Sequence, residues 1–205
     1  MIIEFLLAVT LLELTPGPNM AYLATLALTR GRTAGLIACV GVACGLSVHA
    51  VVTVFGAGTL IQQYPWLYET LRWVGVAYLL YLAWEGWRPK QDTPALRADL
   101  LSSWAPLFMR GFLSNVFNPK SILFFVSVLP TFISGAPEDP SVPLQMVFYG
   151  TIYVGIATII HSAIVLFAAQ LRPVLVKGPG RERVRRVLSV GVALIAIWLA
   201  WSTAR

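Results

Sequence analysis

Two short polar motifs interrupt stretches of the chain that are otherwise apolar. Residues 12–20 read LELTPGPNM and place a carboxylate, Glu13, beside two prolines, a glycine and an asparagine. Far along the chain, Lys120 follows Asn118 and Pro119 within another apolar stretch. A carboxylate can accept a proton or bind a cation, and an ammonium can bind an anion. These two motifs are therefore the first candidates for chemistry.

The prolines predict that a helix is broken at each motif. Proline removes a backbone hydrogen bond and clashes with the preceding turn. Asn118 followed by Pro119 is typical of an N-cap and a first helical position. The Thr-Pro-Gly-Pro segment at 15–18 can be read in the same way at either of its prolines. Each motif thus predicts two half-helices, with a simple proline kink as the alternative.

The composition indicates that the elements holding these motifs cross a membrane. Of the 205 residues, 58% are hydrophobic and only 12% are charged. Soluble domains carry about 25% charged residues, and a bilayer core needs roughly 20 apolar residues per helix. We therefore predict an all-α, polytopic membrane protein. Its six predicted transmembrane helices are 2–28, 35–61, 67–87, 107–133, 143–170 and 184–203.

The distribution of basic residues predicts the orientation of these spans. Twelve of the 15 Lys and Arg residues lie in or beside the first, third and fifth connections. Cytoplasmic loops carry such an excess, so both termini are expected to face outward. The twelve residues are Arg30, Arg32, Arg88, Lys90, Arg97, Arg110, Arg172, Lys177, Arg181, Arg183, Arg185 and Arg186.

The middle connection divides the spans into two halves of opposite orientation. We expect a first three-helix repeat at 1–88, a cytoplasmic linker at 89–106 and a second three-helix repeat at 107–205. Inverted-topology repeats of this kind recur in secondary transporters. The broken helices would be spans one and four, which correspond under this symmetry. Broken backbone at membrane depth is tolerated only where protein or a cavity covers it, so we expect a site between the halves.

The ends of broken helices offer backbone groups of opposite polarity. Free N–H groups at a helix start suit a carboxylate, and free carbonyls at a helix end suit an ammonium. An α-amino acid carries both charges on one carbon. The breaks thus predict a site for the invariant part of an amino acid and leave its side-chain pocket unspecified.

Charged side chains near the two breaks extend this predicted site. A charge at mid-bilayer costs ~3 kcal/mol on insertion scales, so we expect Glu13 and Lys120 to face a cavity or each other. Their pairing is read as a structural salt bridge or as a functional one, in which Lys120 attracts a substrate carboxylate or Glu13 carries a proton. The candidate substrate-binding and translocation residues are Glu13, Thr15, Pro16, Gly17, Pro18, Asn19, Asn115, Asn118, Pro119 and Lys120.

Two histidines occupy similar positions in spans two and five. His49 and His161 each lie near the middle of a predicted span. A histidine there can relay protons with Glu13, because its charge changes near physiological pH. It can equally be an interhelical hydrogen-bonding residue. The sequence leaves both readings open.

With these motifs, the sequence resembles the LysE/RhtB family of amino-acid exporters. The resemblance is carried by LTPGPNM with RGRTAGLIACVGVACG in the first half, GVAYLLYLAWEGW in span three, and RGFLSNVFNPKSILFFVSVLP in the second half. It covers nearly the whole chain in order and spacing. It implies a small exporter in the bacterial cytoplasmic (inner) membrane that moves amino acids or related compounds, driven by protons or another coupling ion.

Other classes of function find less support in the sequence. A membrane-embedded thiol or electron carrier, or a membrane enzyme, is the alternative, but Cys39 and Cys44 lack the spacing of a redox motif and are read as packing residues. No metal-ligand set or nucleotide fingerprint occurs, so we expect no metal, no cofactor and no enzyme activity. The basic run 181–186 is read as a solvated loop, not a nucleic-acid site. Gly41-x-x-x-Gly45 predicts close helix packing, within the fold or between subunits of a homo-oligomer.

Overall fold

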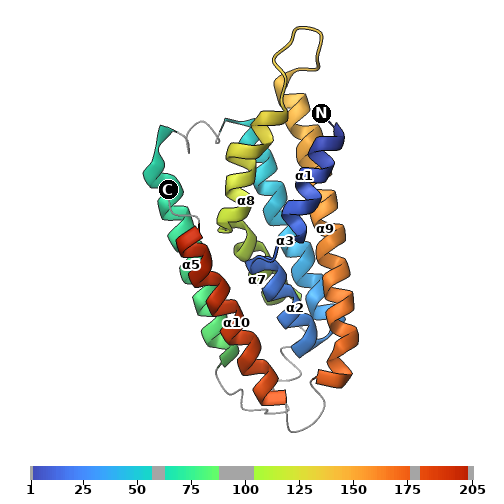
Figure 1. Cartoon of the computed structure of the whole chain (residues 1–205), viewed down its shortest axis with the longest axis vertical. Coiled ribbons are helices and arrows are strands. Elements are labelled where there is room, and N and C mark those ends of the chain that lie inside the picture. Colours follow the sequence, from blue (N-terminus) through green and yellow to red (C-terminus); the bar gives the residue numbers. More distant parts are fainter. Residues whose placement is uncertain (1, 57–62, 88–103, 176–180, 203–205) are drawn as a thin grey trace.

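The computed structural model describes residues 2–56, 63–87, 104–175 and 181–202, and every regular element in these ranges is a helix. Figure 1 shows them as one elongated bundle. In chain order the elements are α1 (Ile2–Leu14), α2 (Pro18–Arg30), α3 (Arg32–Val54), α5 (Pro65–Trp87), α7 (Trp104–Val116), α8 (Pro119–Leu123), the π-helical turn η1 (Phe124–Val128), the 3-10 turn η2 (Leu129–Phe132), α9 (Val142–Leu175) and α10 (Arg181–Ser202).

Three of the predicted spans are clear apolar spans in the structure. Helices α3 and α9 are each long and apolar enough to cross a membrane. The pair formed by α7 and the segment Pro119–Phe132 makes a third, bent by 47° at its break. Helix α10 contains a shorter apolar segment, Arg186–Trp198. The predicted linker at 89–106 lies almost entirely outside the described residues.

The predicted break in the first span is present at 15–17, between α1 and α2. Gly17 is the N-cap of α2 in an extended conformation, with φ −150° and ψ 174°, and Pro18 takes the first helical position. Proline is favoured there because its missing N–H would have no helical partner in any case. Of the two alternatives that the sequence left open, the structure uses Gly17-Pro18.

The predicted break in the fourth span lies at 117–118, between α7 and α8. Asn118 is an N-cap in extended conformation, and its side-chain oxygen accepts a hydrogen bond from the Lys120 backbone N–H at 3.1 Å. This is the cap that the Asn-Pro sequence predicts. The chain then continues through η1 and η2, whose irregular turns the sequence does not predict.

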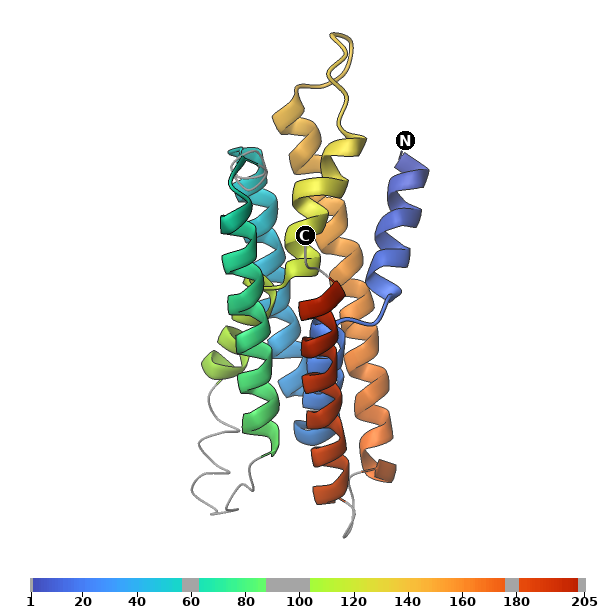
Figure 2. The same cartoon turned by 60° about the vertical axis from the view of Figure 1, so that its left-hand side comes forward.

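Helices from the two ends of the chain interleave in the bundle. Helix α3 packs against both α7 and α9, while α1 and α2 pack against α9. Helices α5 and α10 lie side by side in both views and form one flank of the bundle (Figures 1 and 2). The described helix ends next to the three basic connections lie together at the lower end of Figure 1, whereas the N-terminus lies at the other end.

Small residues allow α3 and α7 to approach closely. A Cβ atom added to Gly41 would lie 2.1 Å from the Phe108 carbonyl oxygen, and one added to Gly45 would lie 2.9 Å from the Phe112 carbonyl oxygen. On the facing helix, a Cβ on Gly111 would lie 2.0 Å from the Ala38 carbonyl oxygen. The Gly41-x-x-x-Gly45 motif therefore serves packing within this chain.

Candidate functional site

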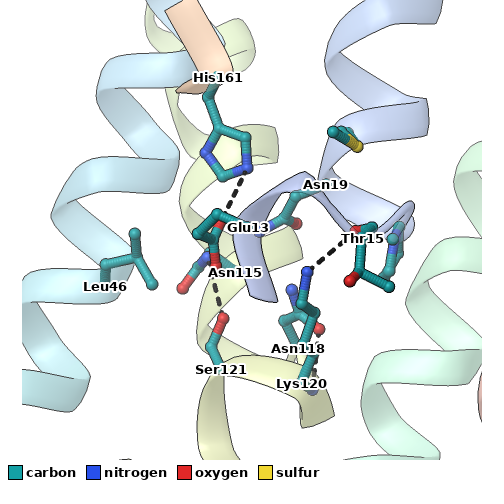
Figure 3. Close-up of a pocket in the computed structure, with 12 residues that line it drawn as sticks. Glu13, Thr15, Asn19, Leu46, Asn115, Asn118, Lys120, Ser121 and His161 are labelled. Atoms are coloured by element: carbon teal, nitrogen blue, oxygen red, sulfur yellow. Dashed lines mark hydrogen bonds and ion pairs between the residues drawn. The ribbon is translucent and has the colours of Figure 1, made fainter. Parts of the chain in front are cut away.

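The two helix breaks meet at the side chain of Lys120. Its ammonium donates hydrogen bonds to the carbonyl oxygens of Leu12, at 2.5 Å, and Thr15, at 3.1 Å (Figure 3). The Leu12 carbonyl lies in the last turn of α1, where it also accepts the Thr15 backbone N–H at 3.2 Å, and the Thr15 carbonyl lies in the break just after the helix. The C-terminal end of a helix is partially negative. The break after α1 is therefore stabilised by a cation from the break before α8, which confirms that the two motifs lie together.

Glu13 has different partners from the one that the sequence predicts. Among the described residues, its carboxylate does not pair with Lys120: Oε2 lies 3.3 Å from His161 Nε2, and Oε1 accepts a hydrogen bond from the Tyr153 hydroxyl at 2.7 Å. Glu13 is only 5% exposed. Glu13 and Lys120 line the same cavity, as expected, but they form no direct salt bridge because the Glu13 side chain points from α1 to α9, the helix packed against it.

Sequence reasoning missed Tyr153, and also Met20, Leu46 and Ser121 of the cavity lining. Tyr153 is fully buried on α9 and contacts Glu13 through its hydroxyl. It lies eight residues before His161, and residues at that separation share one face of a helix. The shared helix face of Tyr153 and His161, opposite Glu13 on α1, is the signal by which the sequence could have identified Tyr153. A tyrosine in an apolar span otherwise reads as a packing residue.

The two histidines lie at different breaks. His161 contacts the Glu13 carboxylate before the first break. His49, on α3, donates its Nε2–H to the Asn115 carbonyl oxygen at 3.2 Å, before the second break. The ring of His49 also stacks on Phe125 with 5.9 Å between centroids. The structure therefore brings His161 and Glu13 together, and it gives His49 the interhelical hydrogen bond that was the alternative reading.

Several buried polar atoms around the breaks lack a hydrogen-bond partner in the described part of the chain. They are the side-chain oxygens of Asn19 and Asn115 and the Nδ1 atom of His161. Asn115 uses its amide nitrogen to contact Ser121 Oγ at 3.4 Å (Figure 3). A buried polar atom without a partner costs about 1–3 kcal/mol unless water or a ligand satisfies it. These atoms therefore mark a place where a polar ligand would be stabilised.

The same residues surround a small internal cavity. The room it leaves for the centre of a water molecule is about 10 Å³, which is roughly what one water needs. The pocket is thus too small for a molecule of amino-acid size in this conformation, although Thr15 on its wall is exposed. The cavity is lined by Glu13, Thr15, Gly17, Pro18, Asn19, Met20, Leu46, Asn115, Asn118, Lys120, Ser121 and His161.

An aromatic cluster covers the site on the side of the N-terminus. The ring of Tyr153 stacks on Phe124, with 4.0 Å between centroids. Phe5, two turns before Glu13 on α1, packs against Tyr149 and Phe132 at 4.6 and 5.2 Å. The cluster separates the buried carboxylate from that end of the bundle, with Tyr153 belonging to both the cluster and the site.

The cysteines do not form a redox pair. Cys39 is buried on α3, with its sulfur 3.5 Å from Ser162 Oγ on α9, and Cys44 is exposed. Both are free thiols. The packing interpretation is therefore right for Cys39 and wrong for Cys44. Within the described ranges, no cluster of three His, Cys, Asp or Glu side chains is arranged to hold a metal ion.

These features together define a class of protein. Apolar helices that meet at two interrupted segments, around a small and largely buried polar pocket, are the build of a membrane transporter. The chain belongs to the family of LysE type translocators, whose sequence model matches residues 10–205. The resemblance noted from the LTPGPNM and NPK motifs is thereby confirmed, and the protein is a transporter and not an enzyme.

Similar proteins cover most of the chain. A homoserine/homoserine lactone efflux protein of Salmonella typhimurium is 30% identical over 179 residues, which span 85% of this chain and 83% of that protein. The uncharacterized membrane protein YahN of Escherichia coli is 32% identical over 91% of this chain and 82% of its own length. The threonine efflux protein of Escherichia coli is 32% identical over 58% of this chain and 60% of its own length. No solved structure matches.

Proposed function

We propose that this protein is a secondary-active exporter of amino acids or closely related compounds across the bacterial cytoplasmic membrane. The observation that carries the proposal is the meeting of two helix breaks at one polar pocket. There Lys120 contacts the Leu12 and Thr15 carbonyls, and Glu13 contacts His161. Relatives named for the efflux of homoserine, homoserine lactone and threonine support the substrate class.

The proposed architecture is six membrane-spanning segments in two inverted three-helix repeats. Its support is the correspondence of contacts between the halves. Helix α1, before the first break, packs against α9, and helix α7, before the second break, packs against α3. The basic connections support an orientation with both termini outside the cell.

The substrate is proposed to bind through its two charged groups at the breaks. The N-terminus of α2 offers N–H groups that no side chain caps, because Gly17 is its N-cap. These groups suit the carboxylate of an amino acid. The carbonyl end of α1 suits the ammonium, which Lys120 contacts in this structure.

Protons are the proposed coupling ion, and Glu13 with His161 is the proposed carrier. The two side chains lie 3.3 Å apart in a buried environment, so one proton can be held between them. A second proton gives the pair a net positive charge that burial disfavours, the more so because the Lys120 ammonium lines the same cavity. Movement of a charged substrate through the adjacent cavity can therefore be linked to protonation of this pair.

Transport by the purified protein in vesicles tests the proposal. The protein is reconstituted with radiolabelled homoserine or threonine inside, and a pH gradient is imposed across the membrane. Export that requires both the protein and the gradient supports the function. Export that ignores the pH gradient but follows a sodium gradient would change the coupling ion, and no export of any amino acid would refute the function.

A further inference from the structure

We infer that Lys120 occupies the subsite that binds the substrate's ammonium, so that substrate and Lys120 compete for the carbonyl end of α1. This inference rests on the proposed function and adds to it the chemical group that the site recognises. It reverses the role that the sequence suggests for Lys120. In place of attracting a substrate carboxylate, Lys120 is a built-in competitor for the substrate's positive charge.

The contacts of the ammonium carry the inference. Lys120 Nζ lies 2.5 Å from the Leu12 carbonyl oxygen and 3.1 Å from the Thr15 carbonyl oxygen. Its side chain reaches across the first break, since a methyl group on Gly17 would lie 3.7 Å from Nζ. An ammonium that donates to the last carbonyls of a helix is stabilised by hydrogen bonds and by the helix dipole. Any primary ammonium of the substrate would find the same two acceptors.

The surroundings favour a cation at this position over an anion. The buried Glu13 carboxylate and the end of α1 contribute negative or partially negative charge to the cavity. The first N–H groups of α8 offer little to an anion, because Asn118 already accepts from the Lys120 backbone N–H. A carboxylate at Lys120 would have to share its ammonium with both carbonyls, which already take two of its three N–H donors.

The names of the relatives agree with recognition through the ammonium. Homoserine, homoserine lactone and threonine all carry an α-amino group, whereas the lactone has no free carboxylate. The ammonium is thus the charged group that these compounds share. The substrate class we infer for this chain is small primary ammonium compounds, with or without a carboxylate.

Competition also gives Lys120 a role in transport. A substrate ammonium takes the two carbonyls and displaces the Lys120 side chain, and the return of Lys120 releases the substrate. Uncharged and anionic compounds cannot replace a cation on these two carbonyl oxygens, so they are not substrates. Because the site is refilled by a tethered cation, the carbonyls of the break stay satisfied when substrate is absent.

Three probes that differ by one group test the inference. They are homoserine, which has both charges, homoserine lactone, which lacks the carboxylate, and 4-hydroxybutanoate, which lacks the amine. Binding to the full-length protein in lipid nanodiscs is measured by calorimetry at mildly acidic pH, where the lactone amine is protonated. The variants are Lys120→Met, which keeps the length and removes the charge, and Lys120→Arg, which keeps a competing cation. Arg32→Met is the control for the loss of one positive charge, because Arg32 is exposed at the start of α3.

The inference predicts tighter binding when the competitor is removed. Lys120→Met should bind homoserine and homoserine lactone more tightly than the wild type by about ten- to a hundredfold, the value of hydrogen bonds to a charged group. Lys120→Arg should bind neither compound more tightly than the wild type does. Arg32→Met should match the wild type, and 4-hydroxybutanoate should not bind any of the four proteins.

Other results would overturn the inference in recognisable ways. Weaker homoserine binding with unchanged lactone binding in Lys120→Met would identify Lys120 as a carboxylate-binding residue. Unchanged or weaker binding of both compounds would show that Lys120 does not occupy their subsite. If Lys120→Met is not recovered folded, Lys120→Gln takes its place with the same expectations. Wild-type protein that binds none of the probes would refute the proposed function itself, and the inference with it.

Discussion

The break between α1 and α2 spans residues 15–17, whereas the break between α7 and α8 spans only 117–118. A histidine from a long, unbroken helix faces the last turn before each break. At the first break, His161 meets the carboxylate of Glu13. At the second, His49 meets the backbone carbonyl of Asn115, whose side chain is a neutral amide. The same scaffold thus carries a titratable pair on one side and a neutral hydrogen bond on the other.

This difference assigns separate tasks to the two breaks. The first break holds the buried carboxylate and the carbonyls that accept an ammonium. The second break supplies the ammonium, and Asn118 caps the short helix that carries it. If both breaks carried a carboxylate, the cavity would bury two negative charges, at a cost of several kcal/mol. In the proposed function, this asymmetry would let one site hold a proton and a substrate charge together.

Replacing the carboxylate of the first break should have the largest effect. Glu13→Gln keeps the shape of the side chain and its hydrogen bond from Tyr153, but it cannot exchange a proton. We expect export driven by a pH gradient to fall to the level of empty vesicles. Exchange of labelled for unlabelled substrate without a gradient should persist, because it needs no net proton transfer. A pH profile equal to that of the wild type would refute the proton role of Glu13.

Adding a carboxylate to the second break is the converse change. Asn115 is fully buried, and its side-chain oxygen has no partner in the described part of the chain. Asn115→Asp should lower the free energy of unfolding by about 3 kcal/mol at neutral pH, because it buries an unpaired charge. The loss should be smaller at acidic pH, where the aspartate is neutral. Thermal unfolding in detergent measures this.

The alanine variant at the same position separates the charge from the lost amide. Asn115→Ala removes the hydrogen bond to Ser121 without adding a charge, so it should be more stable than Asn115→Asp at neutral pH. If the aspartate variant is as stable as the wild type and transports normally, the second break tolerates a carboxylate as the first does. The two breaks would then not differ in their tolerance of a buried carboxylate.

The glycines near the two breaks should respond differently to a methyl group. A Cβ on Gly75 of α5 would lie 1.8 Å from the Phe117 carbonyl oxygen, at the second break. A Cβ on Gly17, at the first break, would meet its nearest neighbour at 3.6 Å, an ordinary contact. We expect Gly75→Ala to cost about 1–3 kcal/mol of stability and Gly17→Ala much less. Gly155→Ala is the control, since no atom lies within 4 Å of its added Cβ.

Comparison of melting temperatures decides this prediction. If Gly75→Ala and Gly17→Ala lower the melting temperature equally, the close packing of α5 on Phe117 does not restrain the second break. A large loss in Gly155→Ala would mean that α9 helix packing, and not the breaks, governs the response.

The positions of the breaks were predictable from the sequence because their signals are local. Proline at the first helical position and Asn118 as its cap act within three residues of the chain. That the carbonyl end of a half-helix suits an ammonium also follows from local polarity, but the sequence did not identify Lys120 as a cation at that end. What the sequence could not give is the partner of each charge. That depends on which face of α1 looks toward α8 and which toward α9.

The aromatic part of the site escaped prediction for a related reason. The turn η1 is π-helical, and the residues Phe124–Val128 give no local signal for it. That turn brings Phe124 against Tyr153 and Phe125 against both Tyr153 and His49. Apolar spans are rich in aromatic residues, so the ones beside a functional carboxylate are recognised only once the helices are packed.

Removing the Tyr153 hydroxyl, which contacts Glu13 before the first break, should have the smallest effect on stability and export. It tests whether a contact to Glu13 matters beyond ordinary packing. Tyr153→Phe keeps the ring stacked on Phe124 but removes the hydrogen bond to Glu13. We expect the free energy of unfolding to fall by about 1–2 kcal/mol, the value of one hydrogen bond to a group that can be charged. Proton-driven export should slow by about tenfold at most, because His161 still contacts the carboxylate.

A tyrosine four residues away on the same helix provides the matched control. Tyr149 is also buried in the aromatic cluster, where its ring packs on Phe5. Among the described residues, however, the hydroxyl that donates a hydrogen bond to Glu13 is that of Tyr153. Tyr149→Phe should therefore leave both stability and export close to wild type. Export is measured per folded molecule in vesicles, and stability by thermal unfolding. Equal effects of the two substitutions would mean that the Tyr153 hydroxyl contributes nothing specific to Glu13. Because Tyr153 contacts Glu13, Tyr153→Phe and not Tyr149→Phe should alter the dependence of export on pH.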